Sequence, residues 1–293
     1  MENDSCNVTL ADDLSDKLVN TKHKTISVTL AVTSFLLNAS MVLIIVTEKA
    51  LRKRNIFQVS LALSDICFAV CVFLLSYIGK FESEVFCICI TFAVISIQAI
   101  GAVAVERFVV LVVFKFKKRA VATKSQIATC ICIWFISLGT TSIFFIAGHT
   151  DHLSFVLSIL DLIILATVYI SYIIIYLSIK KHIRKMSNCT SAAKKSKKLI
   201  LTFSLIIVTC TICWFPLIVH TIVEHLGVNQ CKRNVSIPGF FILALCYSIF
   251  NPIVYGLGIN EIQIVIKERA MKLYNSILNK LTNKTPTVSG VYA

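Results

Sequence analysis

The chain has 293 residues, of which 57% are hydrophobic and only 15% are charged. This composition excludes an ordinary soluble globular protein, in which about a quarter of the residues are charged. The formal net charge of +14 would suit a nucleic-acid partner, but in so apolar a chain it favours contact with anionic lipid and argues against nucleic acid.

The N-terminal segment, residues 1–25, is polar and contains five acidic residues. It has no basic stretch followed by a short apolar one, so it does not resemble a cleaved signal peptide. We expect this segment to be extracellular, ahead of a first membrane span that serves as its own insertion signal.

Seven apolar segments follow, each long enough to cross about 30 Å of hydrocarbon as a helix. They lie at about 26–46, 56–78, 85–114, 127–147, 153–179, 199–223 and 237–258. Lipid admits only helices and closed barrels, and the alternating pattern of a barrel is missing. The sequence therefore predicts an all-α membrane protein with a seven-transmembrane helix bundle over residues 26–258.

The segment after the seventh span, residues 259–293, is more polar. Glu261 to Met271 has the pattern of a short amphipathic helix that lies on the membrane surface. The rest is predicted to be a short cytoplasmic tail, whose Ser and Thr residues could recruit arrestin once phosphorylated or could simply be solvated.

The basic residues predict the orientation of the bundle. One side of the membrane, which includes the tail, holds 23 of the 29 Lys and Arg residues. By the positive-inside rule that side is cytoplasmic, so the N-terminus lies outside a multi-pass protein of the plasma membrane. Glycosylation sequons at Asn7 and Asn234 then lie outside and could carry glycans.

One carboxylate, Asp65, lies in the middle of the second span, where an ionised group needs a cation or several hydrogen-bond donors. Other spans offer Ser96, Ser248 and Asn251 as partners, together with Asn38. One interpretation is an isolated, protonated acid in the core. The other is an oxygen-rich cage in which Asp65 is a ligand of a small hard cation such as sodium.

Two prolines interrupt predicted helices, Pro216 in the sixth span and Pro252 in the seventh. Each removes a backbone hydrogen bond and bends its helix. Large aromatic residues, Trp214 and Tyr255, lie close to them in sequence. The pair suggests hinges that move, whereas a static kink is the simpler explanation.

Together these residues resemble the motifs of the rhodopsin-like, or class A, G-protein-coupled receptors over nearly the whole chain. In span order the motif residues are Asn38, Asp65, the triplet Glu106, Arg107 and Phe108, then Trp134, Tyr176, the group Cys213, Trp214 and Pro216, and the group Asn251, Pro252 and Tyr255. Any one of these matches is weak, but seven in order are strong.

The resemblance implies a role for each group. Glu106 would hold Arg107 in the inactive state, and on activation Arg107 would turn toward Tyr176 and Tyr255 and open a groove for a heterotrimeric G protein. Asp65, Ser96, Ser248 and Asn251 would form an allosteric sodium pocket. Trp214 would be a rotamer switch beneath the ligand.

Several departures narrow the resemblance. Glu82 stands where the family has its outer cysteine in helix three, so the usual bridge to the second extracellular loop cannot form. Only Cys6 and Cys231 remain on the predicted extracellular side, and a disulfide between them is as plausible as two free thiols. A short second loop and a fifth helix without proline are similar to the melanocortin receptors and, more loosely, to the adenosine, cannabinoid and lysolipid receptors.

Another departure concerns the start of helix six. Many relatives carry an acid there that pairs with the helix-three arginine, but the stretch from Ser191 to Lys198 is purely basic. Only Glu106 would then restrain Arg107, and the sequence predicts raised basal signalling.

The ligand is less well defined. Cys89 occupies the position of the aspartate that binds amines, and the span 237–258 has no lysine for retinal, so both ligand classes are disfavoured. Asp161, near the outer end of the fifth span, is an intramembrane carboxylate and favours a basic peptide or small molecule. It could instead reach the lipid headgroups or pair with His220 or Thr221. The predicted ligand pocket consists of Cys89, Asp161, Trp214, Ile218 and Thr221.

Other classes of function remain open at this point. A seven-helix transporter or channel, or a decoy receptor without signalling, is the main alternative, although the two halves of the chain show no repeat and no path of charges. An enzyme is not indicated, because the spans contain no Ser/His pair and no histidines at metal-ligand spacing.

Overall fold

A computed structural model of the chain describes residues 21–78, 83–114, 121–148, 150–185, 190–226, 237–258 and 260–282. Within these ranges all regular secondary structure is helical. Seven of the helices are long and apolar enough to cross a membrane. The predicted fold class, an all-α bundle of seven membrane-length helices, is confirmed.

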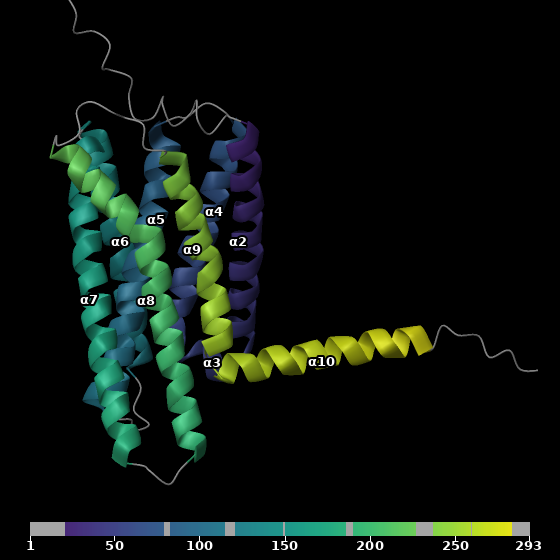
Figure 1. The fold of residues 1–293 in the computed structure, drawn as a ribbon. Coiled ribbons are helices and arrows are strands. Elements are labelled where there is room, and N and C mark those ends of the chain that lie inside the picture. The colour runs from purple at the N-terminus through teal and green to yellow at the C-terminus, as the bar shows by residue number, and fades with distance from the viewer. Residues whose placement is uncertain are drawn as a thin grey trace, which may run out of the picture.

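The helices succeed one another along the chain as Figure 1 shows. The long ones are α2 (Thr21–Thr47), α4 (Ile56–Ile78), α5 (Ser83–Phe108), α6 (Thr123–Ile146), α7 (Thr150–Lys185), α8 (Thr190–His225) and α9 (Ile237–Gly258). A short helix, α3 (Lys49–Arg52), follows α2, and a π-helical turn, η1 (Val109–Val113), continues α5. The last helix is α10 (Asn260–Thr282).

Two helices extend beyond the apolar segments that predicted them. α7 continues through basic residues to Lys185, and α8 begins at Thr190, nine residues before the predicted span. Lysine, arginine and alanine have high helix propensity, so a helix that leaves the hydrocarbon need not end there. The apolar pattern marks only the part of each helix that lipid surrounds.

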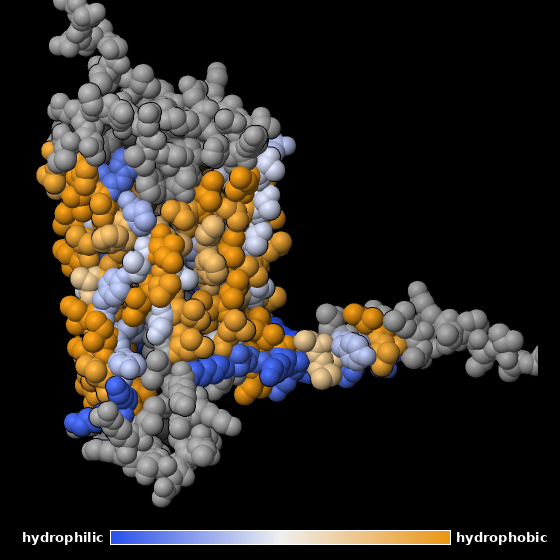
Figure 2. Space-filling view, viewed as in Figure 1, coloured by the Kyte–Doolittle hydropathy of each residue, from blue (hydrophilic) through white to orange (hydrophobic). Residues whose placement is uncertain are grey.

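Six of the long helices form a closed ring of neighbours. α4 packs against α2 and α5, α7 packs against α5 and α8, and α9 closes the ring between α8 and α2. α6 lies outside the ring against α5, and only 11% of its membrane window is buried, compared with 61% for α4. Hydrophobic side chains cover most of the bundle side in Figure 2, as expected for a surface that faces lipid.

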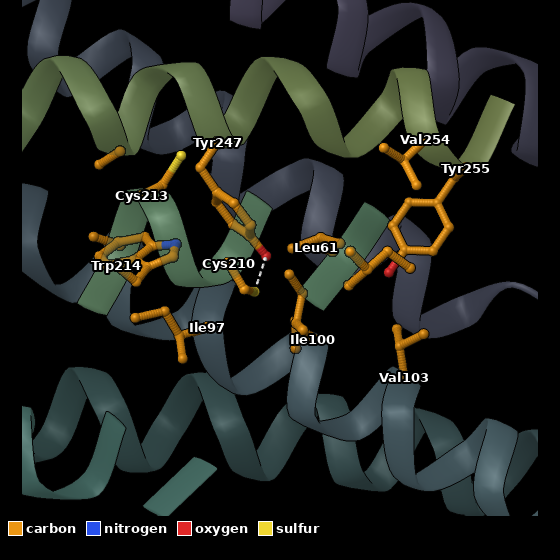
Figure 3. Packing of buried hydrophobic residues seen from close by; sticks show 14 of the residues in the cluster. Leu61, Ile97, Ile100, Val103, Cys210, Cys213, Trp214, Tyr247, Val254 and Tyr255 are labelled. Carbon is orange, nitrogen blue, oxygen red and sulfur yellow. Dashed lines mark hydrogen bonds between the residues drawn. The ribbon is translucent and has the colours of Figure 1, made fainter. Parts of the chain in front are cut away.

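The buried apolar core runs through the middle of the ring. Figure 3 shows Leu61 of α4, Ile100 of α5, Cys210 of α8 and Tyr247 of α9 side by side within it. Tyr247 meets the ring of Trp214 edge to face, with 5.7 Å between the ring centroids. The cluster extends along the bundle as far as Ile262 of α10.

Both predicted prolines lie inside helices, Pro216 in α8 and Pro252 in α9. α8 bends in the part nearest its C-terminal end, as Figure 1 shows. Pro216 lies nine residues before that end. Because proline removes a backbone hydrogen bond and crowds the preceding turn, it accounts for the bend.

α10 projects sideways from the end of the bundle (Figure 1) and carries both hydrophobic and hydrophilic side chains (Figure 2). It is longer than the predicted amphipathic segment and ends at Thr282. Ile262 is fully buried at its base. An ion pair of 3.1 Å between Arg269 and Glu48 joins it to the connection between α2 and α3.

Candidate functional site

Asp65 is the centre of a buried polar cluster. Its side chain is 1% exposed. The Ser96 hydroxyl of α5 donates to Oδ1 at 2.7 Å, and Nδ2 of Asn251 on α9 donates to Oδ2 at 2.9 Å. The structure therefore brings together three of the predicted sodium-pocket residues, and Asp65 is not an isolated acid.

The cluster continues to α2 through Ser248, the fourth predicted residue. Nδ2 of Asn38 donates to the Ser248 carbonyl at 2.9 Å and to the Ser34 carbonyl at 3.0 Å. The hydroxyls of Ser34 and Ser248 lie 2.6 Å apart. Ser34 was not among the predicted residues, although it lies four residues before Asn38 and hence on the same helix face.

The donor set of this cluster fits a small hard cation. Asp65, Ser96 and Ser248 supply one carboxylate and two hydroxyl groups, the oxygen ligands that such ions prefer. Among the described residues no side chain forms an ion pair with Asp65, so the carboxylate is balanced only by hydrogen bonds. A monovalent cation would supply the missing charge.

The second group lies at the inner end of α5, around Glu106. Its side chain is 6% exposed, and Oε1 accepts a hydrogen bond of 2.9 Å from Nε2 of Gln126 on α6. In the described part of the chain Glu106 forms no ion pair with Arg107. The Arg107 guanidinium nevertheless lies within electrostatic reach of the Glu106 carboxylate, so the restraint of Arg107 by Glu106 stays a prediction.

Gln126 is a residue that sequence reasoning missed. It is 1% exposed at the start of α6, and no motif or apolar pattern singled it out. Its burial follows from the position of α6 against α5, which depends on the packing of the bundle.

Arg107 is partly buried and lies within electrostatic reach of two buried tyrosines, Tyr172 of α7 and Tyr255 of α9. Phe108 packs against the core beside it. Tyr176, the predicted α7 partner, is 43% exposed, and the ammonium of Lys180 lies 5.8 Å from its ring centroid. Tyr176 therefore faces away from the bundle, and Tyr172 takes the predicted inward position.

The third group lies in the outer half of the bundle. Asp161 of α7 is only 6% exposed, which rules out the prediction that it reaches the headgroups. Within the described residues its Oδ1 has no hydrogen-bond partner. The hydroxyl of Thr221 donates instead to the carbonyl of Leu217 at 3.0 Å.

Three other residues of the predicted ligand pocket have apolar surroundings. Cys89, Trp214 and Ile218 are buried in the main core. The indole nitrogen of Trp214 has no hydrogen-bond partner among the described residues, and the same holds for the hydroxyl of Tyr255. A buried polar group without a partner costs about 1–3 kcal/mol. A hydrogen-bond partner for either atom in another state of the protein would remove this cost.

Some predicted residues lie outside the described ranges. They are Asn7 and Asn234, predicted to be glycosylated, Cys6 and Cys231, predicted as a disulfide or two thiols, and Glu82.

The chain is similar to known receptors. Residues 147–255 match the family model described as 7 transmembrane receptor (rhodopsin family). Substance-K receptor from Bos taurus is 27% identical over 263 residues, with 74% of this chain and 67% of the relative covered. Melanocortin receptor 5 from Mus musculus is 23% identical over 193 residues, with 62% of this chain and 58% of the relative covered. The chain thus spans roughly three fifths to two thirds of the length of these relatives.

Proposed function

Since this chain belongs to the rhodopsin-like family of seven-transmembrane receptors, a family that is not enzymatic, we propose that it binds an extracellular ligand at the plasma membrane and activates heterotrimeric G proteins. The proposal includes G-protein coupling at the end of the bundle where the basic residues gather. Arrestin recruitment through the tail is part of the same proposal.

The observation that carries this proposal is the position of Arg107. It lies at the inner end of α5, partly buried, with Tyr172 and Tyr255 in electrostatic reach. The Tyr255 hydroxyl lacks a hydrogen-bond partner in the described structure. A guanidinium that can turn toward the unpaired Tyr255 hydroxyl is the part of a switch that a static membrane scaffold would not need.

For the ligand we propose a basic peptide or small molecule that places a cationic group on Asp161. A carboxylate that is buried and incompletely hydrogen-bonded gains most from an opposite charge. Asp161 shares a face of α7 with Leu157 and Leu165, both buried, so it points into the bundle.

We also propose that sodium binds at Asp65 with Ser96 and Ser248 as further oxygen ligands, and that Asn251 supports the carboxylate. Bound sodium would balance the Asp65 charge and tie α4, α5 and α9 together. The side chains of the cluster hold this arrangement by the hydrogen bonds described above.

The test is guanine-nucleotide exchange on a panel of Gα subunits, driven by membranes that contain the wild type or Arg107→Ala. We expect wild-type membranes to accelerate exchange above the Arg107→Ala level, since the basic start of α8 offers no acid to restrain Arg107. Equal exchange by the two proteins, with and without pools of basic peptides, would contradict the proposal. A flux of ions or solutes in its place would support a transporter, and ligand binding without exchange would support a decoy.

The ligand proposal has its own test once an agonist is found. We expect Asp161→Asn to reduce the potency of a basic agonist about tenfold or more, the effect of losing a buried charge pair. The variant keeps the volume of the side chain. Unchanged potency would remove Asp161 from the binding site.

A further inference from the structure

The inner end of α8 lies directly against the last residue of α9. Gly258 is buried, and a Cβ atom added to it would clash with Cγ2 of Thr202 on α8 and lie 2.5 Å from its Oγ1. Carbon atoms in contact normally lie about 3.5–4.0 Å apart. Glycine is therefore required here for space, and any side chain at this position would force the two helices apart.

A second contact reinforces the first. Lys198, one turn before Thr202, donates a hydrogen bond from Nζ to Oε1 of Gln263 on α10. Nε2 of Gln263 donates in turn to the carbonyl of Leu257 at 2.8 Å. Carbonyls in the last turn of a helix have no partner within the helix, so Gln263 satisfies one of them. It links α8, α9 and α10 at a single point.

The Thr202 side chain is itself held in place. Its hydroxyl donates to the Lys198 carbonyl at 2.9 Å, and the residue is 7% exposed. The donor group of Lys198 also lies near the C-terminal end of α9, where the helix dipole favours a positive charge. Both packing and electrostatics therefore hold α8 against α9 and α10.

We propose that this contact, formed by Lys198 and Thr202 with Leu257, Gly258 and Gln263, is an autoinhibitory restraint. It keeps the inner end of α8 closed in a chain whose sequence from Ser191 to Lys198 lacks the acid that could pair with Arg107. The inference rests on the proposed function, because an outward movement of α8 is what would admit the G protein.

The first experiment adds a methyl group at Gly258 to push α8 away from α9. Gly258→Ala should raise basal nucleotide exchange about fivefold or more, the factor expected from overpacking at the low end of its usual cost. Adding Thr202→Ala removes Cγ2 and Oγ1 and should return exchange toward the wild-type rate. Gly256→Ala is the matched control, because its Cβ would lie 3.7 Å from Met41, an ordinary contact.

A distance measurement separates this inference from the proposed function. Spin labels on noncanonical amino acids at the exposed positions Leu201 of α8 and Ile277 of α10 avoid the 12 native cysteines. Double electron–electron resonance should give a longer distance between the two labels in Gly258→Ala than in the wild type. Adding Thr202→Ala should restore the wild-type distance. Gln263→Leu, which adds no bulk at the glycine, should also lengthen this distance and serves if Gly258→Ala does not fold.

The outcomes are distinct. Unchanged distances in both Gly258→Ala and Gln263→Leu would overturn the restraint. Longer distances without exchange by any variant, the wild type included, would support the restraint and overturn the proposed function.

Discussion

Tyr172 is the α7 tyrosine that faces Arg107, because it belongs to the buried stripe of that helix. The stripe consists of residues spaced three or four apart, namely Leu157, Asp161, Leu165, Val168, Tyr172, Ile175 and Ile179. Tyr176 lies one position beyond Ile175 and is therefore rotated about 100° out of the stripe. A switch built on α7 must use the tyrosine inside the bundle.

Replacing this tyrosine tests the assignment. We expect Tyr172→Phe to lower the Arg107-dependent part of nucleotide exchange about tenfold, since a hydrogen bond to a charged group is lost in the active state. Tyr176→Phe is the matched control and should change exchange less than about twofold. A larger effect at Tyr176 would restore the assignment made from the motif order.

Asp65 leads to a prediction about ions. Sodium that binds the folded protein raises its stability by mass action. In detergent, replacing choline chloride with sodium chloride at equal ionic strength should raise the Tm of the wild type by a few degrees, and potassium chloride should have a smaller effect. Asp65→Asn should remove the difference. Equal melting curves for the wild type in all three salts would argue against a sodium site.

Among the seven membrane-length helices, α6 has the smallest buried share, and polar contacts join it to its neighbours. Large apolar side chains such as Phe135 and Ile146 face outward, so α6 contributes little to the core. Its side-chain hydrogen bonds to the ring are Trp134 to Ser60 at 2.9 Å, Ser137 to Gln98 at 3.0 Å and Gln126 to Glu106 at 2.9 Å. Each lies on the one face that meets α4 and α5.

The Gln126 contact should be the most costly of these to lose. Gln126→Leu leaves a buried carboxylate without its donor, which we expect to destabilise the protein by about 1–3 kcal/mol. Thr129→Ala, an exposed position on the same helix, is the control and should have little effect. Thermal unfolding of the two purified variants checks this, and equal Tm values would mean that Glu106 finds another donor.

The whole molecule combines a hydrophobic belt with a strong asymmetry of charge. Lys and Arg gather at the end of the bundle where α10 begins, and the predicted orientation places that end in the cytosol. Anionic lipid in the inner leaflet would stabilise this arrangement and attract the basic residues Lys267, Arg269 and Lys272 of α10.

Glycan mapping tests the orientation. We expect Asn7→Gln to remove an enzyme-sensitive glycan and increase mobility on a gel, whereas Asn188→Gln should change nothing because it lies on the predicted cytoplasmic side. An antibody against an N-terminal tag should label intact cells without permeabilisation. The opposite pattern would show that the bundle has the reverse orientation, with the N-terminus in the cytosol.

The fold class and much of the polar cluster could be predicted from the amino-acid order, because lipid imposes a length and a composition on every span. The depth of Asp65, Ser96 and Asn251 in their spans placed them near one another before any contact was known. The partners of Glu106 and Arg107, the inward face of α7 and the fit of Gly258 against Thr202 depend on how each helix is rotated and how closely it approaches its neighbours. Spans that are apolar on all sides contain little information about rotation, so these features appear only when the seven helices pack together.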